Sequence, residues 1–484
     1  MKLKLILLAL AALAVAFQMP LNAQADKSTE IRLRGVVEGF YGIPWTHEQR
    51  LDMLTFMAGQ GLNAYIYAPK DDEYHRKYWR VPYPEAKYRE LQELSDRAKE
   101  LHIDVIFAVS PGNDIDFSGA GRDADRKAMV EKLDAMYNIG IRHFALFFDD
   151  IPTKDASGQV AFANWINSNY IKKKKDCHSL ILVPTEYFLW DMKKDNKVTA
   201  YTSALAAKLD KDILILYTGA EVCPDGLDKQ TVMGANKLYG RSLGIWWNYP
   251  VSDYLKEKLA LGPLDKMPTD ITGRDIPALF INPMEKAELS KIAIATGAAY
   301  AKNPAGYDEN TAWERAIEDQ YGDLSSEMKL FAGHSQRMEN NWAHIGRQDA
   351  QELANLYKAL WPLVDGKGTI PKERILEKLL DNNQSRKNAI TRLLNELPRN
   401  VLAECDLQLM QLSRMTDAER YALLILQGKD SRETAALYDR FKKTKAQIDE
   451  NSSSAKISEQ VLGKFIDDFV SWNTKNVGAL NSNG

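Results

Sequence analysis

From residue 31 onward, short apolar runs alternate with longer stretches in which apolar side chains recur at helical spacing. Eight of these runs have the length and the nearly uninterrupted apolar character of strands that are buried on both faces, as in a parallel sheet. The eight runs cover residues 35–40, 64–68, 105–109, 143–148, 180–183, 213–217, 244–247 and 278–281.

Amphipathic helices are predicted between the runs. The sequence Thr46-His47-Glu48-Gln49 has the form of a capping box, which marks the start of a helix. Other helical stretches cover residues 88–101, 124–139, 160–170 and 200–209. Eight β-α units in roughly 270 residues predict an α/β fold with a closed (β/α)8 TIM barrel, in preference to an open doubly wound sheet. No G-x-G-x-x-G or P-loop motif favours nucleotide binding.

The pattern changes after about residue 305, where strand signals end. Leu353, Leu356 and Leu360 share one helical face, and similar apolar stripes follow around residues 376–380 and 390–397. These stripes predict an all-helical C-terminal domain, such as a bundle. We therefore expect a catalytic barrel over residues 26–305 and a helical domain over residues 306–484.

The first 25 residues resemble a secretory signal. Lys2 and Lys4 precede an apolar run over residues 5–17, and Ala23-Gln24-Ala25 has the form of a cleavage site. The run is too short to span a bilayer comfortably, and no Cys near the cleavage site points to a lipid anchor. Cleavage after Ala25 would release an exported protein, periplasmic or secreted. No membrane span is expected later in the chain.

Composition narrows the classes of partner. The formal net charge of -3 gives no general attraction to nucleic acid. The three cysteines, Cys177, Cys223 and Cys405, are too few and too far apart for a disulfide framework. The sequence leaves the oligomeric state open.

Polar and aromatic residues follow the predicted strands at their carboxyl ends. In a barrel of parallel strands those ends meet at the active-site mouth. The segments are Gly39-Phe40-Tyr41-Gly42, Pro69-Lys70-Asp71-Asp72, Pro111-Gly112-Asn113-Asp114, Asp149-Asp150, Pro184-Thr185-Glu186-Tyr187, Thr218-Gly219, Trp246-Trp247-Asn248-Tyr249 with Asp253, and Asn282-Pro283. Because neighbouring side chains on a strand face opposite ways, at most one of Trp246 and Trp247 should line the mouth.

Asp149 and Asp150 are the strongest chemical signal. A single Asp after a strand often only caps the next helix. Two adjacent carboxylates can instead titrate at separated pKa values and supply an acid and an ionised partner.

Other kinds of chemistry have less support. The seven His residues show no metal-binding spacing, no G-x-S-x-G elbow is present, and the pairs Asp71-Asp72 and Asp149-Asp150 are weak candidates for a hard cation. We expect neither metal nor cofactor. Aromatic rings, amides and paired acids suit glycoside hydrolysis.

Several motifs resemble glycoside hydrolase family 84, which contains the O-GlcNAcases and bacterial β-N-acetylglucosaminidases. The resemblance covers the whole expected barrel and continues weakly into the helical part. The motifs are Arg34-Gly35-Val36-Val37-Glu38-Gly39-Phe40-Tyr41-Gly42, Tyr67-Ala68-Pro69-Lys70-Asp71-Asp72, Phe147-Phe148-Asp149-Asp150-Ile151, Pro184-Thr185-Glu186-Tyr187, Trp246-Trp247-Asn248-Tyr249-Pro250-Val251-Ser252-Asp253-Tyr254 and Asn282-Pro283-Met284-Glu285.

The resemblance implies a retaining exo-β-N-acetylglucosaminidase that removes terminal β-linked GlcNAc from glycans or glycoproteins. The 2-acetamido oxygen of the sugar would attack the anomeric carbon and form an oxazoline, an exception to the two-carboxylate mechanism. Asp149 would polarise the acetamide N–H, Asp150 would act as acid and then base, and Tyr187 would support the oxazoline. The acetamide pocket would be framed by Tyr41, Thr218, Val222 and Trp246. The sugar hydroxyls and ring would be held by Gly39, Lys70, Asn248, Asp253 and Asn282.

Two alternatives stay open: a hyaluronidase-like endo-hexosaminidase and a non-catalytic glycan-binding barrel. The intact Asp149-Asp150 pair argues against the binder, because binding needs no proton donor. Members of the family often carry a small α/β domain before the barrel. The few residues between Ala25 and the first strand leave no room for one, so we expect it to be absent. The natural aglycone is left open.

Overall fold

The computed structural model describes residues 29–367, 369–428 and 431–481. The expected signal segment, residues 1–25, lies outside the described residues. Among the helices that are described, none is both long and apolar enough to cross a membrane.

Eight parallel strands close into a barrel, so the predicted fold is confirmed. Around the barrel the order is β1-β10-β9-β8-β5-β4-β3-β2. The predicted runs correspond to β1 (Leu33–Glu38), β2 (Ala64–Tyr67), β3 (Asp104–Val109), β4 (His143–Phe147), β5 (Ile181–Val183), β8 (Leu214–Tyr217), β9 (Gly244–Trp247) and β10 (Ala278–Ile281).

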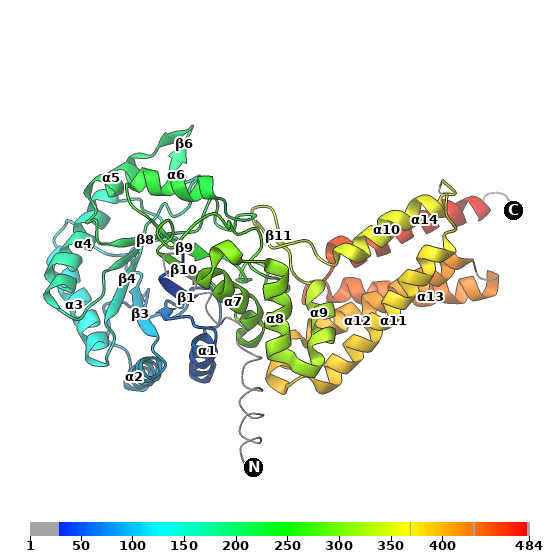
Figure 1. Ribbon diagram of the computed structural model, residues 1–484, viewed down its shortest axis with the longest axis horizontal. Coiled ribbons are helices and arrows are strands. Elements are labelled where there is room, and N and C mark those ends of the chain that lie inside the picture. The colour runs from blue at the N-terminus through cyan, green and yellow to red at the C-terminus, as the bar shows by residue number, and fades with distance from the viewer. Residues whose placement is uncertain (1–28, 368, 429–430, 482–484) are drawn as a thin grey trace, which may run out of the picture.

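Helices surround the barrel (Figure 1). They are α1 (His47–Gly59), α2 (Glu85–Glu100), α3 (Arg122–Asn138), α4 (Ala156–Asn169), α5 (Ala200–Lys208), α6 (Lys229–Tyr239) and α7 (Ala287–Lys302). The expected capping box starts α1: the Thr46 side chain accepts from the Gln49 N–H, and the Gln49 side chain accepts from the Thr46 N–H.

One unit departs from the regular pattern. The connection between β9 and β10, residues 248–277, contains no helix. Pro250, Pro263 and Pro268 interrupt this segment, and proline in a helix interior removes a hydrogen bond and clashes with the preceding turn. The segment instead runs as an irregular loop that brings Asp253 and Tyr254 to the barrel mouth.

Strand alternation divides the core into two layers. Side chains such as Val37, Phe147 and Trp246 fill the barrel interior. Their neighbours, including Val36 and Trp247, pack outward in the layer shared with the surrounding helices. The prediction that at most one of the two adjacent tryptophans lines the mouth is therefore confirmed.

Helices also dominate the rest of the chain. α8 (Glu309–Tyr321) packs against α7 of the barrel, α9 (Ser325–Gly333) lies between α8 and α11, and an elongated bundle extends away from the barrel (Figure 1). The bundle consists of α10 (Gln351–Val364), α11 (Glu373–Glu396), α12 (Arg399–Gln427), α13 (Ser431–Asn451) and α14 (Lys464–Asn481). This region also contains a two-stranded hairpin that the all-helical prediction did not include, β11 (Met338–Glu339) with β12 (His344–Ile345). A second small ribbon, β6 (Lys193–Lys194) with β7 (Lys197–Val198), follows β5.

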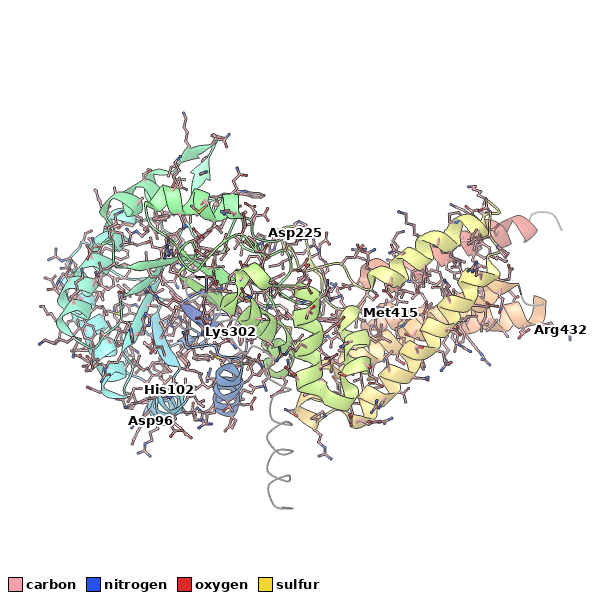
Figure 2. The ribbon with its side chains drawn as sticks, viewed as in Figure 1. Asp96, His102, Asp225, Lys302, Met415 and Arg432 are labelled. Atoms are coloured by element: carbon pink, nitrogen blue, oxygen red, sulfur yellow. The ribbon has the colours of Figure 1, made fainter. Side chains whose placement is uncertain are left out.

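The two ends of the barrel carry different loops. Asp225 lies in the loop after β8, at the carboxyl ends of the strands, whereas His102 lies in the turn before β3, at their amino ends (Figure 2). In parallel barrels the carboxyl ends form the active-site face, and the opposite face serves mainly stability.

Candidate active site

Asp149 and Asp150 follow β4 where regular strand geometry has ended. Asp150 has a φ of 54°, in the left-handed region that Asp tolerates better than most residues. This change of backbone direction places both consecutive side chains on the wall of one cavity. Neither residue caps the next helix, because Asp155 performs that role by accepting from the Gly158 N–H at 2.9 Å.

Asp149 is buried and paired with a buried cation. The ammonium of Lys70, a residue that is only 4% exposed, donates to Oδ2 of Asp149. Oδ1 of Asp149 is buried without a hydrogen-bond partner. A buried oxygen of this kind is costly unless a ligand supplies a donor. The free acceptor therefore marks a position where a substrate N–H would bind.

Asp150 is exposed and is held by two phenols from other loops. Tyr41 donates to Oδ2 at 2.9 Å, and Tyr187 donates to Oδ1 at 3.0 Å. Arg76 contacts the Tyr41 hydroxyl at 3.2 Å and the Asp150 carbonyl at 3.1 Å. Burial, followed by the charge of Asp150, raises the pKa of both tyrosines well above the usual phenol value. Both hydroxyls therefore remain protonated donors at neutral pH.

A chain of amides lines the opposite wall. Asn248 Oδ1 accepts from Trp246 Nε1 at 2.7 Å and from Asn282 Nδ2 at 3.0 Å. The Asn282 side-chain oxygen accepts from the Gly39 N–H at 3.3 Å, and the Asn248 side-chain nitrogen donates to the Val222 carbonyl at 2.9 Å. The chain fixes the orientation of both amides.

Gly39 must be glycine for steric reasons. A Cβ at this position would lie 2.4 Å from Cζ2 of Trp246. The absent side chain leaves room for the Trp246 indole, which lines the cavity, next to the end of β1.

The loop after β8 closes another side of the cavity. The Thr218 hydroxyl donates to the Glu221 carbonyl at 2.7 Å, and the Thr218 N–H donates to the Tyr187 carbonyl at 2.9 Å. Cys223 also lines the cavity, and burial raises the pKa of its thiol to about 12. It is therefore not a thiolate nucleophile at neutral pH.

Asp253 connects two loops at the mouth. Its carboxylate accepts from the Tyr41 N–H at 2.8 Å. Burial raises the pKa of this carboxyl above the usual range, and the nearby Asp150 adds to the effect.

These loops surround one cavity of about 490 Å³, a size typical of small-molecule sites. Each of the twelve residues singled out in the sequence lines it: Gly39, Tyr41, Lys70, Asp149, Asp150, Tyr187, Thr218, Val222, Trp246, Asn248, Asp253 and Asn282. The structure thus brings them together, while their individual roles remain predictions.

The structure adds a residue that the sequence had not suggested. Trp342, in the turn of the β11–β12 hairpin, lines the cavity and stays 43% exposed. Its ring lies against Tyr254, with centroids 4.8 Å apart. The one available signal was that this tryptophan directly follows the polar segment Glu339-Asn340-Asn341, which suits a turn more than a helix core.

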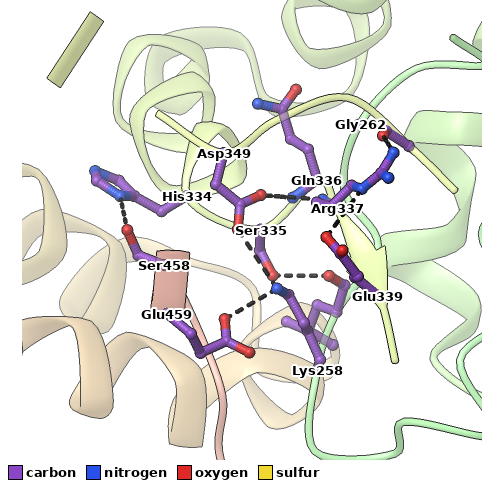
Figure 3. A network of polar contacts seen from close by, with 12 residues as sticks. Lys258, Gly262, His334, Ser335, Gln336, Arg337, Glu339, Asp349, Ser458 and Glu459 are labelled. Carbon is purple, nitrogen blue, oxygen red and sulfur yellow. Dashed lines mark hydrogen bonds and ion pairs between the residues drawn. The ribbon is translucent and has the colours of Figure 1, made fainter. Parts of the chain in front are cut away.

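A polar network holds this hairpin against the barrel (Figure 3). The buried carboxylate of Asp349 accepts from the backbone N–H groups of Gln336 and Arg337, at 2.6 and 3.0 Å. Lys258, on the β9–β10 loop, lies 3.4 Å from Asp349 and 2.9 Å from Glu459. The network ties the loop, the hairpin and the start of the last helical segment together, and so positions Trp342.

Three residues expected near the mouth have other roles. Tyr249 is buried, accepts from the Gly262 N–H at 2.7 Å and donates to the Gln336 carbonyl at 2.9 Å. Asp72 accepts from Tyr67 at 2.5 Å, whereas Asp71 accepts from the Gly42 N–H at 2.8 Å. Tyr249 is thus part of the core, and Asp71 and Asp72 do not form a joint carboxylate site.

Comparisons with known proteins agree with this geometry. A β-N-acetylglucosaminidase family model matches residues 34–333, and a hyaluronidase post-catalytic domain-like model matches residues 352–466. The protein O-GlcNAcases of Mus musculus and Rattus norvegicus are each 33% identical over 282 residues, which is 56% of this chain and 30% of theirs. The chain therefore spans less than a third of these curated relatives.

Solved structures resemble nearly the whole chain. CpGH84B is 34% identical with a TM-score of 0.86, and the match covers 91% of this chain and 77% of that one. A mutant O-GlcNAc hydrolase of Thermobaculum terrenum is 26% identical with a TM-score of 0.79, covering 93% of this chain and 97% of that one. With the family model spanning more than half of the sequence, the chain belongs to the β-N-acetylglucosaminidase family, glycoside hydrolase family 84.

Proposed function

We propose that this protein is a retaining exo-β-N-acetylglucosaminidase that works by substrate-assisted catalysis. The proposal rests on the two adjacent aspartates that follow β4. Oδ1 of Asp149 is a buried acceptor without a hydrogen-bond partner, and the carboxyl of the neighbouring Asp150 is exposed. The free Oδ1 of Asp149 suits an acetamide N–H. Polarisation of that N–H makes the acetamide oxygen a better nucleophile, so the sugar supplies the group that the cavity lacks.

Asp150 then serves both chemical steps. As the acetamide oxygen bonds to the anomeric carbon, the acetamide N–H proton passes to Asp149, and the glycosidic oxygen leaves with the proton of Asp150. In the second step Asp150 removes a proton from water, which attacks the anomeric carbon and reopens the oxazoline, while Asp149 returns its proton to the nitrogen. Tyr41 and Tyr187, which hold Asp150, keep it on the side from which the leaving group departs.

The other lining residues bind the sugar. Tyr187, Thr218, Val222 and the indole of Trp246 suit the acetamide methyl and the oxazoline ring. Lys70, Asp253 and the two linked amides offer donors and acceptors to the hydroxyl groups. Binding energy from these contacts favours catalysis to the extent that it increases in the transition state.

Matched chromogenic glycosides test the proposal. We expect turnover of an aryl N-acetyl-β-glucosaminide and negligible turnover of the aryl β-glucoside with the same leaving group, since the glucoside lacks the internal nucleophile. A thiazoline analogue of the oxazoline should inhibit tightly. Trapping a covalent glycosyl-enzyme on a carboxylate would refute the mechanism.

One observation favours a second function. The helical part matches the hyaluronidase post-catalytic domain-like model, so an endo-acting hexosaminidase is the alternative. Product size on hyaluronan distinguishes the two: an endo-enzyme releases internal oligosaccharides, whereas an exo-enzyme removes single terminal sugars.

The proposed substrates are glycans or glycoproteins that carry terminal β-linked GlcNAc. The name O-GlcNAcase, carried by the rodent relatives, supports GlcNAc on protein hydroxyls as one such substrate. Release of GlcNAc from an O-GlcNAc peptide, compared with a mucin-type or N-glycan antenna, tests which aglycone the enzyme accepts.

We further propose that the protein is exported, to the periplasm or the medium. The support is the charged and apolar segment before Ala25. Mass spectrometry of the amino terminus, after expression of the full chain and cell fractionation, tests cleavage at that residue. An uncleaved chain confined to the cytoplasm would refute export.

A further inference from the structure

A cluster of potential metal ligands lies at the end of the barrel opposite the cavity. Asp104 and His143 are the first residues of β3 and β4, and His178 lies just before β5. One ligand atom from each of the three residues lies within 4.8 Å of the other two. His102, in the turn before β3, marks this face in Figure 2. The residues are far apart in the sequence, so no local metal-binding spacing reveals them.

The separation between Asp104 and His178 matches that of a metal-bound set, and the separation between Asp104 and His143 is somewhat longer. Its Oδ2 lies 3.5 Å from Nε2 of His178 and 3.9 Å from Nδ1 of His143. Ligand atoms at a tetrahedral zinc ion, with bonds near 2.0–2.1 Å, lie about 3.3–3.5 Å apart. Both imidazoles approach the same Asp104 oxygen, and their rings stack with centroids 5.0 Å apart.

His143 is oriented as metal-binding histidines are. Its Nε2 lies 3.0 Å from the Ser179 carbonyl. A carbonyl only accepts, so Nε2 carries the hydrogen and, in the neutral ring, Nδ1 presents its lone pair to the cluster. This pattern, in which one ring nitrogen donates to a carbonyl and the other faces the ion, is typical of metal sites.

The facing nitrogen has no hydrogen-bond partner. His143 is only 6% exposed, and its Nδ1 is buried and unpaired. A buried lone pair that faces a carboxylate oxygen, here 3.9 Å away, is unfavourable unless a proton or a metal ion lies between them. Backbone bonds fix the neighbours: the His178 N–H donates to the Arg142 carbonyl, and the Asp104 N–H donates to the Asn63 carbonyl, both at 2.9 Å.

We infer that Asp104, His143 and His178 form a binding site for a late first-row divalent cation, with Zn²⁺ as the natural candidate. Two imidazoles and one carboxylate suit Zn²⁺, Co²⁺ or Ni²⁺ better than Mg²⁺ or Ca²⁺, which prefer all-oxygen ligands. The partly exposed Asp104 and His178 leave a fourth position open to water. The ion would join the amino ends of β3, β4 and the segment before β5.

Calorimetric titration of the tag-free, chelator-treated full chain with Zn²⁺ tests the site. We expect one ion per chain, no competition from Mg²⁺, and an absorption spectrum typical of low-coordinate Co²⁺ when Co²⁺ replaces Zn²⁺. Binding should raise the thermal unfolding midpoint, because the ion binds only the folded chain. Turnover of a chromogenic N-acetylglucosaminide should be unchanged by chelation, since the ion lies at the opposite end of the barrel.

Variants of His178 and Asp104, which are more exposed than His143, test the metal site even if the buried His143→Ala variant fails to fold. His178→Ala and Asp104→Asn should each weaken binding by more than about 100-fold, since even loss of an outer-shell partner costs about 10–100-fold. His102→Asn, at an exposed histidine on the same face with a φ of 56°, is the matched control and should bind normally. Failure of the wild type to bind Zn²⁺ below millimolar concentration would overturn the inference. Undiminished binding in both ligand variants would also overturn it.

Discussion

The different roles proposed for Asp149, which polarises the acetamide, and Asp150, the acid and base, give the sharpest prediction. Asp149→Asn keeps the shape of the side chain but removes the charge that Oδ1 would offer to the acetamide N–H. Hydrogen bonds to charged groups contribute about 1.5–3 kcal/mol, which corresponds to about a 10- to 150-fold loss in rate. Because acetamide attack is required whatever the leaving group, this loss should be similar for acidic and unactivated aglycones.

Asp150→Asn should behave differently. A general acid contributes about 10²- to 10⁴-fold, and the contribution is needed most when the leaving oxygen is basic. The variant should therefore lose most of its kcat/KM on alkyl glycosides and much less on an acidic phenol glycoside. The assay is kcat/KM over a series of N-acetylglucosaminides that differ in leaving-group pKa, for both variants and the wild type.

Folding must be checked, since Asp149→Asn leaves the buried Lys70 ammonium without its charged partner. Circular dichroism and thermal unfolding establish the folded fraction. Asp319→Asn, which breaks an exposed ion pair of 3.5 Å on α8, is a control for carboxylate loss elsewhere. Equal dependence on leaving-group pKa in the two active-site variants would refute the assignment, and the reverse pattern would show that the roles are exchanged.

Three further predictions rest on other contacts. Trp342→Ala should lower kcat/KM about 3- to 10-fold on a glycopeptide but leave small aryl glycosides unchanged, as expected for loss of aromatic stacking beyond the sugar. Trp190→Ala, at a 63% exposed tryptophan outside the cavity, is the control, and an equal loss on both substrates would contradict an aglycone role. Burial lowers the pKa of His75 from 6.5 to about 4, so its contribution of about 3 kcal/mol is present above pH 6.5 and lost as the pH falls toward 4. Urea unfolding at several pH values should show a smaller pH dependence in His75→Gln, and an unchanged dependence would be inconsistent with this origin. Gly35→Ala would place Cβ 1.6 Å from a carbonyl oxygen of β2 and should cost at least about 3 kcal/mol or prevent folding, whereas Gly234→Ala meets nothing within 4 Å. Similar thermal midpoints for these two glycine variants would disprove the steric argument.

The candidate site was predictable because a barrel converts sequence order into spatial order. Each residue just past the carboxyl end of a strand must lie at the same face, so Gly39, Lys70, Asp149 and Asn282 could be assigned to one cavity without knowledge of their contacts. The pairing of Lys70 with Asp149 could not be inferred in this way, because it depends on how the loop after β2 folds over the mouth.

The residues that were missed or misplaced show the limit of the same reasoning. Trp342 comes from a hairpin outside the barrel, and a buried network around Asp349 determines where it lies. Tyr249 follows a strand as the cavity-lining residues do, yet its hydroxyl turns into the core and bonds to Gln336 and Gly262. The residue types next to a strand do not show whether a side chain lines the cavity or turns into the core.

The sequence by itself determined the eight barrel strands, the helices α1 to α5, the helical character of the C-terminal part and the face at which the chemistry lies. These features follow from apolar periodicity and from residue types at strand ends, which are properties of neighbouring residues. Only the tertiary structure decided which tyrosines hold Asp150, that Trp342 reaches the cavity, and that Asp104, His143 and His178 meet at the other end. Contacts between distant segments depend on loop paths and on the packing of whole side chains, and a run of adjacent residues encodes neither of these.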